Sequence, residues 1–503
     1  MAGLPALLLV AGLLVGGCGG SPAPSAGQPV TGSTATLAPP ASPTVASSVG
    51  PASSHAPSSA ATSSAAPAGP SPAASGTPSP SSPSGAAGTA DWSVYHRDAA
   101  RTGLDPAFPA LRGPLAVAWS RPLDGAVYAE PLVVSGTVIA ATENDTVYAL
   151  DPVSGRVLWT RHLGTPVRLS SLPCGNIDPL GITGTPAFDP LTGSLFAVAE
   201  VQGPRHVLFA LDPSTGVVRW SRGIDLPGDD PATHQQRPAL AVANGYVYVG
   251  LGGLAGDCGQ YRGEVAGVPT SGRGATIAYR VPVAREGAVW ATPGPAIDAS
   301  GNLYVSVGNG SSTTTYDGSD SVLELSPALQ LRSRFAPATW ARDNATDADL
   351  GSLGPVLIPG GWVFIAGKSG TGYVLRQGSL GGIGGQVASA QVCAAFGGAA
   401  RLSTTVFVPC QDGLRAVRIG PDGSIHVAWH TASGADGSPV VGGGAVWSLD
   451  LAAGVLYRLD PATGTATAHV SVGAVPHFAS PALWGGRVLV GTMRGVASVG
   501  AAG

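Results

Sequence analysis

The sequence predicts an all-β protein, an eight-bladed β-propeller made of four-stranded antiparallel blades. The main observation is a repeat: VYALDPVSGRVLW at residues 147–159 returns as VLFALDPSTGVVRW at 207–220 and, more weakly, as LYRLDPATGTATAHV at 456–470. A strand–turn–strand unit that recurs along a chain is typical of a repeat architecture. The composition agrees, because 74 glycines, 45 prolines and only 11% charged residues suit many short strands joined by turns.

Each repeat contains a tight turn between two strands. The residues from Val147 to Leu150 are β-branched, aromatic or apolar and suit a strand, while Asp151, Pro152 and Gly155 supply the turn, in which glycine is free to adopt positive φ. Trp159 closes the second strand. We interpret the aspartates of such turns as structural residues without chemistry: Asp145, Asp151, Asp212 and Asp460.

The first ninety residues are not expected to join the fold. The apolar run at 4–15 is too short to span a bilayer and leads into VGGC, which resembles the lipobox of bacterial lipoprotein signal peptides. This resemblance implies that residues 1–18 form a signal peptide segment with cleavage before Cys18, whose thiol takes the lipid. No Lys or Arg precedes the run, which departs from that pattern. The alternative is a buried apolar strand that ends in an ordinary cysteine.

Residues 19–90 predict a disordered tether. The segment is rich in Ser, Pro and Ala and contains no Asp, Glu, Lys or Arg, so it offers little side-chain burial to offset the entropy of ordering. As a flexible coil it would span roughly 45 Å. Such a tether can hold the folded domain, residues 91–503, away from a membrane surface.

Charge and cysteine content narrow the partners and the compartment. The formal net charge of −4 provides no basic field for nucleic acid, and we expect a monomer.

Besides Cys18, the even number of cysteines suggests two disulfides in an exported chain. Of the three possible pairings we favour the one that joins adjacent repeat units, Cys174 with Cys258 and Cys393 with Cys410. A metal site is the alternative, but the CxxC spacing is absent.

From residue 115 onward the chain divides into units of three to four strands. The expected units are 127–163, 182–224, 237–283, 290–340, 350–392, 396–430, 438–472 and 478–501. The last unit is one strand short, and the strand LAVAWSRPL at 115–123 has no partner before it. Pairing the two closes the ring and leaves no open edge. Seven blades, or a stack of two β-sandwiches, are the alternatives.

The Ala-Leu-Asp-Pro-x-Ser/Thr-Gly-x-x-x-Trp pattern resembles the repeat of the pyrroloquinoline-quinone (PQQ) propeller family, over residues 91–503. In that family the glycine caps the turn and the tryptophan docks onto the neighbouring blade. The family includes quinoprotein alcohol dehydrogenases and also non-catalytic members, such as the propeller lipoprotein of the outer-membrane barrel-assembly machinery. The fold therefore does not by itself decide the activity.

Three segments resemble the dehydrogenase site. In SVGNG at 306–310, Asn309 matches an asparagine that ligates calcium beside the quinone. In AGKSGTGYVL at 366–375, Lys368 matches a basic residue that contacts the quinone, and it is the only lysine of the chain. ATDADLG at 345–351 lies where the catalytic aspartate is found, with Asp347 and Asp349 as candidates. The alternative for Lys368 is an exposed lysine at a strand end.

Arg237 is a further candidate for contact with a cofactor. In HQQRPALAV it begins a strand of the innermost type, so its side chain can line the central channel. Its alternative role is a salt bridge to Asp229 or Asp230. The histidines lie in unrelated units, which argues against a histidine metal cluster.

Several departures weigh against an active dehydrogenase. The vicinal Cys-Cys pair that covers the quinone is absent, and in GDCGQYRGEV at 256–265 the position of the calcium-binding Glu holds Cys258 or a neighbour. Loss of that carboxylate weakens calcium binding. No CxxCH motif for a c-type haem is present.

The sequence thus favours a propeller in the cell envelope, anchored by lipid to the outer face of the cytoplasmic membrane. This propeller would bind or scaffold an envelope protein or a cell-wall ligand and would need no cofactor. The alternative is a PQQ-dependent alcohol or sugar dehydrogenase with calcium at the propeller centre.

Overall fold

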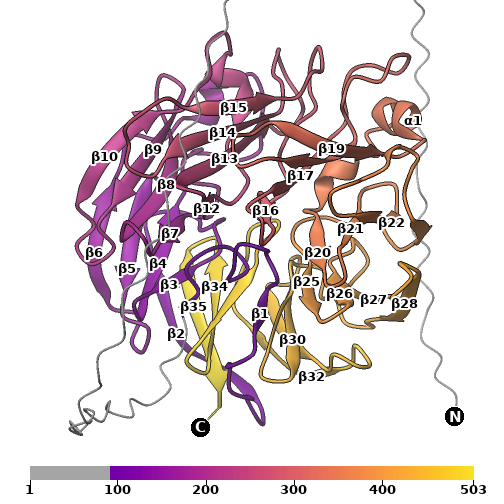
Figure 1. The fold of residues 1–503 in the computed structure, drawn as a ribbon. Coiled ribbons are helices and arrows are strands. Elements are labelled where there is room, and N and C mark those ends of the chain that lie inside the picture. The colour runs from indigo at the N-terminus through magenta and orange to yellow at the C-terminus, as the bar shows by residue number, and fades with distance from the viewer. Residues whose placement is uncertain (1–90, 503) are drawn as a thin grey trace, which may run out of the picture. The chain divides into compact units, whose positions relative to one another are not determined.

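Eight small antiparallel sheets follow one another along the chain in the computed structural model, and they form the eight blades of a β-propeller (Figure 1). The structure describes residues 91–502. The expected signal peptide with Cys18 and the expected tether therefore lie outside the described residues. The prediction of eight four-stranded blades is confirmed, and each of the eight expected units contains one blade.

Within each blade the strands pair in chain order, from a buried inner strand to an outer strand that alternates between half-buried and exposed residues. The first four blades contain β3 (Leu132–Val134), β4 (Thr137–Thr142), β5 (Thr146–Leu150) and β6 (Val157–His162); β7 (Ala187–Asp189), β8 (Ser194–Val201), β9 (Arg205–Leu211) and β10 (Val218–Gly223); β12 (Ala241–Ala243), β13 (Tyr246–Gly253), β14 (Glu264–Pro269) and β15 (Ile277–Arg280); β16 (Ala296–Ile297), β17 (Leu303–Val307), β18 (Ser321–Leu325) and β19 (Leu331–Ala336).

The next three blades repeat this order, and the eighth takes its outer strand from the start of the domain. These blades contain β20 (Val356–Ile358), β21 (Trp362–Ala366), β22 (Thr371–Arg376) and β24 (Ala388–Gln391); β25 (Ala400–Leu402), β26 (Thr405–Val408), β27 (Arg415–Ile419) and β28 (Ile425–His430); β29 (Val440–Gly442), β30 (Ala445–Asp450), β31 (Val455–Leu459) and β32 (Ala466–Ser471); β33 (Pro481–Trp484), β34 (Arg487–Thr492), β35 (Gly495–Ala501) and β2 (Leu115–Pro122).

Short strands and helices decorate the blades. Three short strands extend the sheets of the third, fourth and seventh blades: β11 (His234–Gln235), β23 (Gly382–Ile383) and β1 (Leu104–Asp105). The helical turns are η1 (Leu169–Ser171), η2 (Pro231–Thr233), α1 (Trp340–Ala345) and η3 (Leu350–Ser352). Between residues 91 and 502, none of the helices has the length and apolar character needed to cross a bilayer.

The ring closes as the sequence predicts. β2 pairs antiparallel with β35 along its whole length, from Leu115 opposite Ala501 to Pro122 opposite Gly495. Figure 1 shows the indigo β2 beside the yellow β35, so an early strand and the last strand of the described chain share one blade. This pairing gives hydrogen-bond partners to the backbone groups at the strand edge that the three strands of the last unit would otherwise expose.

The repeat tryptophans join neighbouring blades. Trp159, on β6, lies against Gly216 in the turn of the second blade, and its indole N–H donates to the carbonyl of Pro213 at 3.0 Å. Arg161 Nε donates to the carbonyl of Gly216 at 2.7 Å. Trp119 with Pro152 and Trp429 with Pro461 form the same indole bond at other blade junctions. The interpretation of the repeat as a turn-and-docking unit is therefore confirmed.

A segment before the first blade ties distant blades together. Trp92 exchanges two backbone hydrogen bonds with Val133 of the first blade, and β1 pairs in parallel with β29 of the seventh. Between these points, the carbonyls of Ala99 and Thr102 accept from backbone N–H groups of the fourth and sixth blades. The buried guanidinium of Arg101 donates to the carbonyls of Tyr95, Leu240 and Pro295. Residues 92–105 therefore add contacts of high sequence separation that the docking repeat alone does not provide.

The favoured disulfide pairing is confirmed. Cys174 is bonded to Cys258 with a Cα–Cα distance of 6.0 Å, and Cys393 to Cys410 with 5.7 Å. The first bridge joins the segment between the first and second blades to a loop of the third, and the second joins the end of the fifth blade to the sixth. None of the four cysteines is therefore free to act as a metal-binding thiolate.

Asp145 differs from the other turn aspartates. Asp151, Asp212 and Asp460 accept hydrogen bonds from backbone N–H groups of their own turns, as expected. Asp145 also occupies a turn, with φ of 54°, but it is fully buried and neither carboxylate oxygen has a hydrogen-bond partner in the described chain. Burial, together with the charges of Glu143 and Glu200, raises the pKa of Asp145 to about 9.

The docking contact leaves no room for a side chain at Gly216. Its φ is +69° and an added Cβ would lie 2.5 Å from the Trp159 ring, so Gly216→Ala should lower the free energy of unfolding by roughly 1–3 kcal/mol. Gly223→Ala is the control, because its Cβ would meet nothing within 4 Å. Urea titration of both variants measures the difference. Equal stability of the two variants would contradict the docking account.

Asp145 should make stability depend on pH. Its pKa in the folded protein lies above that of the unfolded chain, so its stability contribution falls as pH rises from ~4 toward about 9. Asp145→Asn removes the charge and tolerates positive φ. We expect it to raise the free energy of unfolding at pH 8 by roughly 1 kcal/mol or more, with a smaller gain at pH 4. Urea titrations at both pH values test this, with Asp151→Asn as the exposed control; a loss of stability at pH 8 in Asp145→Asn would refute it.

Candidate functional site

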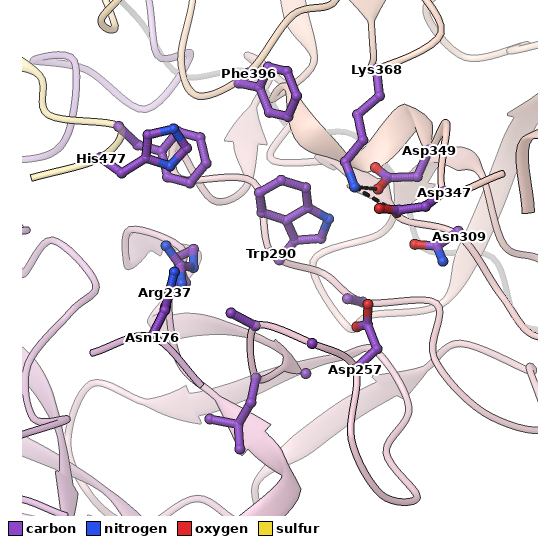
Figure 2. Close-up of a pocket in the computed structure, with 16 residues that line it drawn as sticks. Asn176, Arg237, Asp257, Trp290, Asn309, Asp347, Asp349, Lys368, Phe396 and His477 are labelled. Atoms are coloured by element: carbon purple, nitrogen blue, oxygen red, sulfur yellow. Dashed lines mark hydrogen bonds and ion pairs between the residues drawn. The ribbon is translucent and has the colours of Figure 1, made fainter. Parts of the chain in front are cut away.

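Loops from several blades enclose a pocket of about 280 Å³ (Figure 2). All five residues that the sequence singled out for catalysis, cofactor or metal binding line it: Arg237, Asn309, Asp347, Asp349 and Lys368. They come from the third, fourth and fifth blades and the loops between them. The structure therefore brings together residues that are far apart in the sequence, up to the 131 positions between Arg237 and Lys368.

Lys368 and two aspartates form the charged end of the pocket. Lys368 follows β21, and its Nζ lies 2.6 Å from Asp347 Oδ1 and 2.8 Å from Asp349 Oδ2. Figure 2 shows the ammonium group pointing between the two carboxylates. The side chain of Lys368 is 22% exposed, so the alternative of a freely exposed strand-end lysine is not what the structure shows.

The two aspartates differ in their surroundings. The side chain of Asp347 is 64% exposed, whereas that of Asp349 is 1% exposed and its Oδ1 has no hydrogen-bond partner in the described chain. Burial raises the pKa of Asp349 to about 6, although Lys368 opposes the shift. Burial also acts against the charge of Lys368, but the carboxylates outweigh it and raise the pKa of the lysine. Asp349 is thus the better placed of the two to exchange a proton near neutral pH.

Oxygen ligands lie beside this cluster. Asn309 follows β17 and lines the pocket together with Asp257, a residue that sequence reasoning did not single out. Asp257 precedes Cys258 in the segment where the position aligned with the calcium-binding Glu holds Cys258 or a neighbour. Asp257 brings a carboxylate from this segment into the pocket. Its Oδ1 accepts a hydrogen bond from the hydroxyl of Tyr261. The Cys174–Cys258 bridge fixes the loop that carries Asp257.

In the described chain, the pocket residues do not belong to a cluster of acidic and histidine side chains close enough to share a metal ion. Between residues 91 and 502, three such side chains lie close enough to share an ion only at Asp229, His234 and Glu264. The guanidinium of Arg280 pairs with both Asp229 and Glu264 there. The positive charge of Arg280 is therefore shared by both carboxylates of this group.

The other end of the pocket is aromatic and cationic. Trp290 lies between the Lys368 cluster and Arg237 in Figure 2, and Lys368 Nζ is 5.6 Å from the centroid of its ring. The guanidinium of Arg237 is 5.7 Å from the centroid of the Phe478 ring. Arg237 forms no salt bridge among the ion pairs of the described residues, and Asp229 pairs with Arg280 instead. The salt-bridge alternative for Arg237 is therefore wrong.

Arg237 also belongs to a recurring position. In five other blades, the residue before the proline that begins the inner strand is polar and buried: Glu130, Thr185, Thr292, Ser438 and Ser480. Burial lowers the pKa of Arg237, while the charge of Glu143 opposes that shift. The aromatic lining residues Trp290, Phe396, His477 and Phe478 were missed, because none of them lies in the repeat pattern.

This arrangement suits one kind of ligand. A flat ring can stack on Trp290, negative groups can contact Lys368 and Arg237, and the oxygens of Asn309, Asp257 and Asp349 are the ligand type that hard cations prefer. The pocket can therefore hold a planar anion together with a divalent cation.

Comparison with known proteins supports the same family. Residues 116–253 match the family model described as outer membrane protein assembly factor BamB. Two curated relatives are 30% identical: a 1-butanol dehydrogenase (cytochrome c) of Thauera butanivorans, over 33% of this chain and 23% of the relative, and the quinohemoprotein alcohol dehydrogenase ADH-IIG of Pseudomonas putida, over 40% and 30%. The alignments thus span less than a third of the length of these relatives.

Solved structures of both functional kinds share the fold. The quinohemoprotein alcohol dehydrogenase from Comamonas testosteroni matches with a TM-score of 0.64 and 19% identity, over 82% of this chain and 81% of that one. BamB from Moraxella catarrhalis matches with a TM-score of 0.55 and 15% identity, over 76% of this chain and 99% of that one. The repeats, the eight blades and the family model matched at residues 116–253 together support a PQQ-like β-propeller.

Proposed function

We propose that the central pocket binds a PQQ-type quinone with a calcium ion and that the protein oxidises alcohols or sugars. One observation carries this proposal: Asn309, Asp349 and Lys368, which resemble the family's site residues in three separate segments, line the same pocket. The curated relatives named above are dehydrogenases. Their names support the proposal, although the alignments cover a minor part of each relative.

The residues present fit such a cofactor. Its flat ring system matches the face of Trp290, and its carboxylates match the cations Arg237 and Lys368. Asn309 and Asp257 offer oxygen atoms to calcium. Asp349 Oδ1 is buried without a hydrogen-bond partner in the described chain, so it remains available to accept a proton. When bound, the quinone would supply the acceptor for the two electrons of the substrate.

The chain's own residues have separate tasks in this proposal. Asp349 accepts the proton of the substrate hydroxyl, because burial holds its pKa at about 6 and it is mostly ionised at neutral pH. Lys368 orients Asp349 through their 2.8 Å ion pair. Trp290 covers one face of the site and excludes water from it.

A binding or scaffolding module is the second candidate. Cys258 or a neighbour stands at the position aligned with the calcium-binding Glu, and Lys368 already pairs with Asp347 and Asp349 without a ligand. In this role the propeller would bind an envelope protein or a cell-wall ligand, need neither PQQ nor calcium, and act as a monomer without nucleic acid. Its similarity to BamB from Moraxella catarrhalis supports this candidate at the level of the fold.

Reconstitution decides between the two candidates. The purified full chain is incubated with PQQ and calcium, then bound quinone absorbance and dye reduction with 1-butanol or D-glucose are measured. We expect one quinone per chain and substrate-dependent dye reduction. Lys368→Ala should weaken quinone binding by roughly tenfold or more, and Asp349→Asn should lower turnover more than quinone binding.

The matched control is Arg156→Ala. It removes an exposed cation that does not line the pocket. It should bind quinone as the native chain does. No bound quinone at saturating calcium would overturn the dehydrogenase proposal and favour the scaffold.

We also propose that the protein is exported and anchored by lipid at Cys18 to the outer face of the cytoplasmic membrane. The VGGC sequence that ends at Cys18 supports this. Cys18→Ser, or treatment with globomycin, should move the protein from the membrane fraction to the soluble fraction, as measured by fractionation and immunoblotting. An unchanged membrane fraction in both experiments would refute the anchor.

A further inference from the structure

A second cavity of about 240 Å³ adjoins the first one. Phe396, His477 and Phe478 line both cavities, so these three side chains form the partition between them. Figure 2 shows Phe396 and His477 on the side of the first pocket away from the acids that surround Lys368. The remaining walls of the second cavity come from the sixth and seventh blades.

The second cavity has a carboxylate but no cationic side chain at its polar end. Asp436 lines it, and no lysine or arginine does. Asp436 Oδ1 accepts a hydrogen bond from the backbone N–H of Leu451 at 2.9 Å, and the ion pairs of the described chain include none with Asp436. Burial, and then the nearby charge of Asp450, raise the pKa of this carboxyl. A cation at Asp436 would offset both effects.

Aromatic faces form the rest of the wall. The rings of Phe396 and Phe478 are 6.4 Å apart and inclined by 21°. Burial, and then the charge of Arg237, lower the pKa of His477, so its imidazole is neutral at neutral pH and does not repel a cation. Phe478 has φ of 68°, a conformation that bulky residues rarely adopt. Its neighbours therefore hold this ring in place at a local energetic cost.

We propose that the second cavity binds a small organic ammonium ion, with its apolar part against Phe396 and Phe478 and its charged group at Asp436. The aromatic rings offer apolar faces for the ligand's apolar part, and the carboxylate offers the ammonium group a charge-assisted hydrogen bond. An anionic ligand would meet the carboxylate of Asp436 without a cationic side chain to balance it. This site does not depend on quinone binding, so it can exist in a dehydrogenase or in a scaffold.

The sharpest test compares two ligands of nearly equal shape. Benzylamine is protonated at pH 7.5 and benzyl alcohol is neutral, and isothermal titration calorimetry measures the binding of each to the full chain without quinone. We expect benzylamine to bind roughly tenfold or more tightly than benzyl alcohol. Equal binding of the two, or preferential binding of D-glucose, would overturn the proposal.

Variants locate the site. Asp436→Asn keeps an oxygen that can accept from the N–H of Leu451, so the loop should fold while the preference for benzylamine disappears. Leu451→Phe should fill part of the cavity and weaken both ligands. Asp422→Asn removes a carboxylate from an outer turn of the sixth blade and is the control, with unchanged binding.

Quinone binding is measured in parallel in the same variants. Asp436→Asn should leave it unchanged, because Asp436 does not line the first pocket. If the native chain binds no quinone, this would count against the proposed oxidoreductase alone. If Asp436→Asn still prefers benzylamine, this would count against the ammonium site alone.

Discussion

The docking of a tryptophan onto the turn of the next blade is the contact on which the molecule depends. Each such contact combines an indole packed on a glycine with an indole N–H bond to a proline carbonyl, at 3.0 Å for both Trp119 and Trp159. Because Trp119, Trp159 and Trp429 make this contact in the same way, it sets the angle between the blades at these three junctions. The loops between blades then converge on the axis, and side chains from distant segments can share one pocket. The placement of the pocket residues is thus a consequence of contacts between the outer strands and the turns of neighbouring blades.

Other contacts refine this frame near the pocket. Residues 92–105 bond to several blades that the repeat does not connect directly, and the pairing of β2 with β35 removes the remaining open edge. The Cys174–Cys258 bridge then holds the loop that presents Asp257. A rigid scaffold is what a site built on loops requires, since small displacements of charged groups change their interaction strongly. The pocket can therefore keep Lys368 between two carboxylates although all three lie outside regular strands.

Much of this architecture could be predicted from the sequence, for a physical reason. Strand periodicity and the Asp-Pro-x-Ser/Thr-Gly turn are local signals, so the blade boundaries, the closing strand and the disulfide pairing followed from counting units. Asn309, Asp349 and Lys368 were found because each lies in a segment that resembles a known site. Trp290, Phe478 and Asp257 were not, because their role depends on which loops meet in space. Asp145 shows the same limit: its turn was evident, but its burial beside Glu143 and Glu200 depends on contacts between blades.

The central claim is that the pocket around Trp290 is a site for a planar anion and a hard cation. A crystal structure of the full chain grown with PQQ and calcium tests it most directly. The account predicts a flat ligand against the Trp290 ring, with its carboxylates at Lys368 and Arg237 and a cation at the oxygens of Asn309 and Asp257. An empty pocket at saturating ligand, or a ligand bound only elsewhere on the propeller, would contradict it.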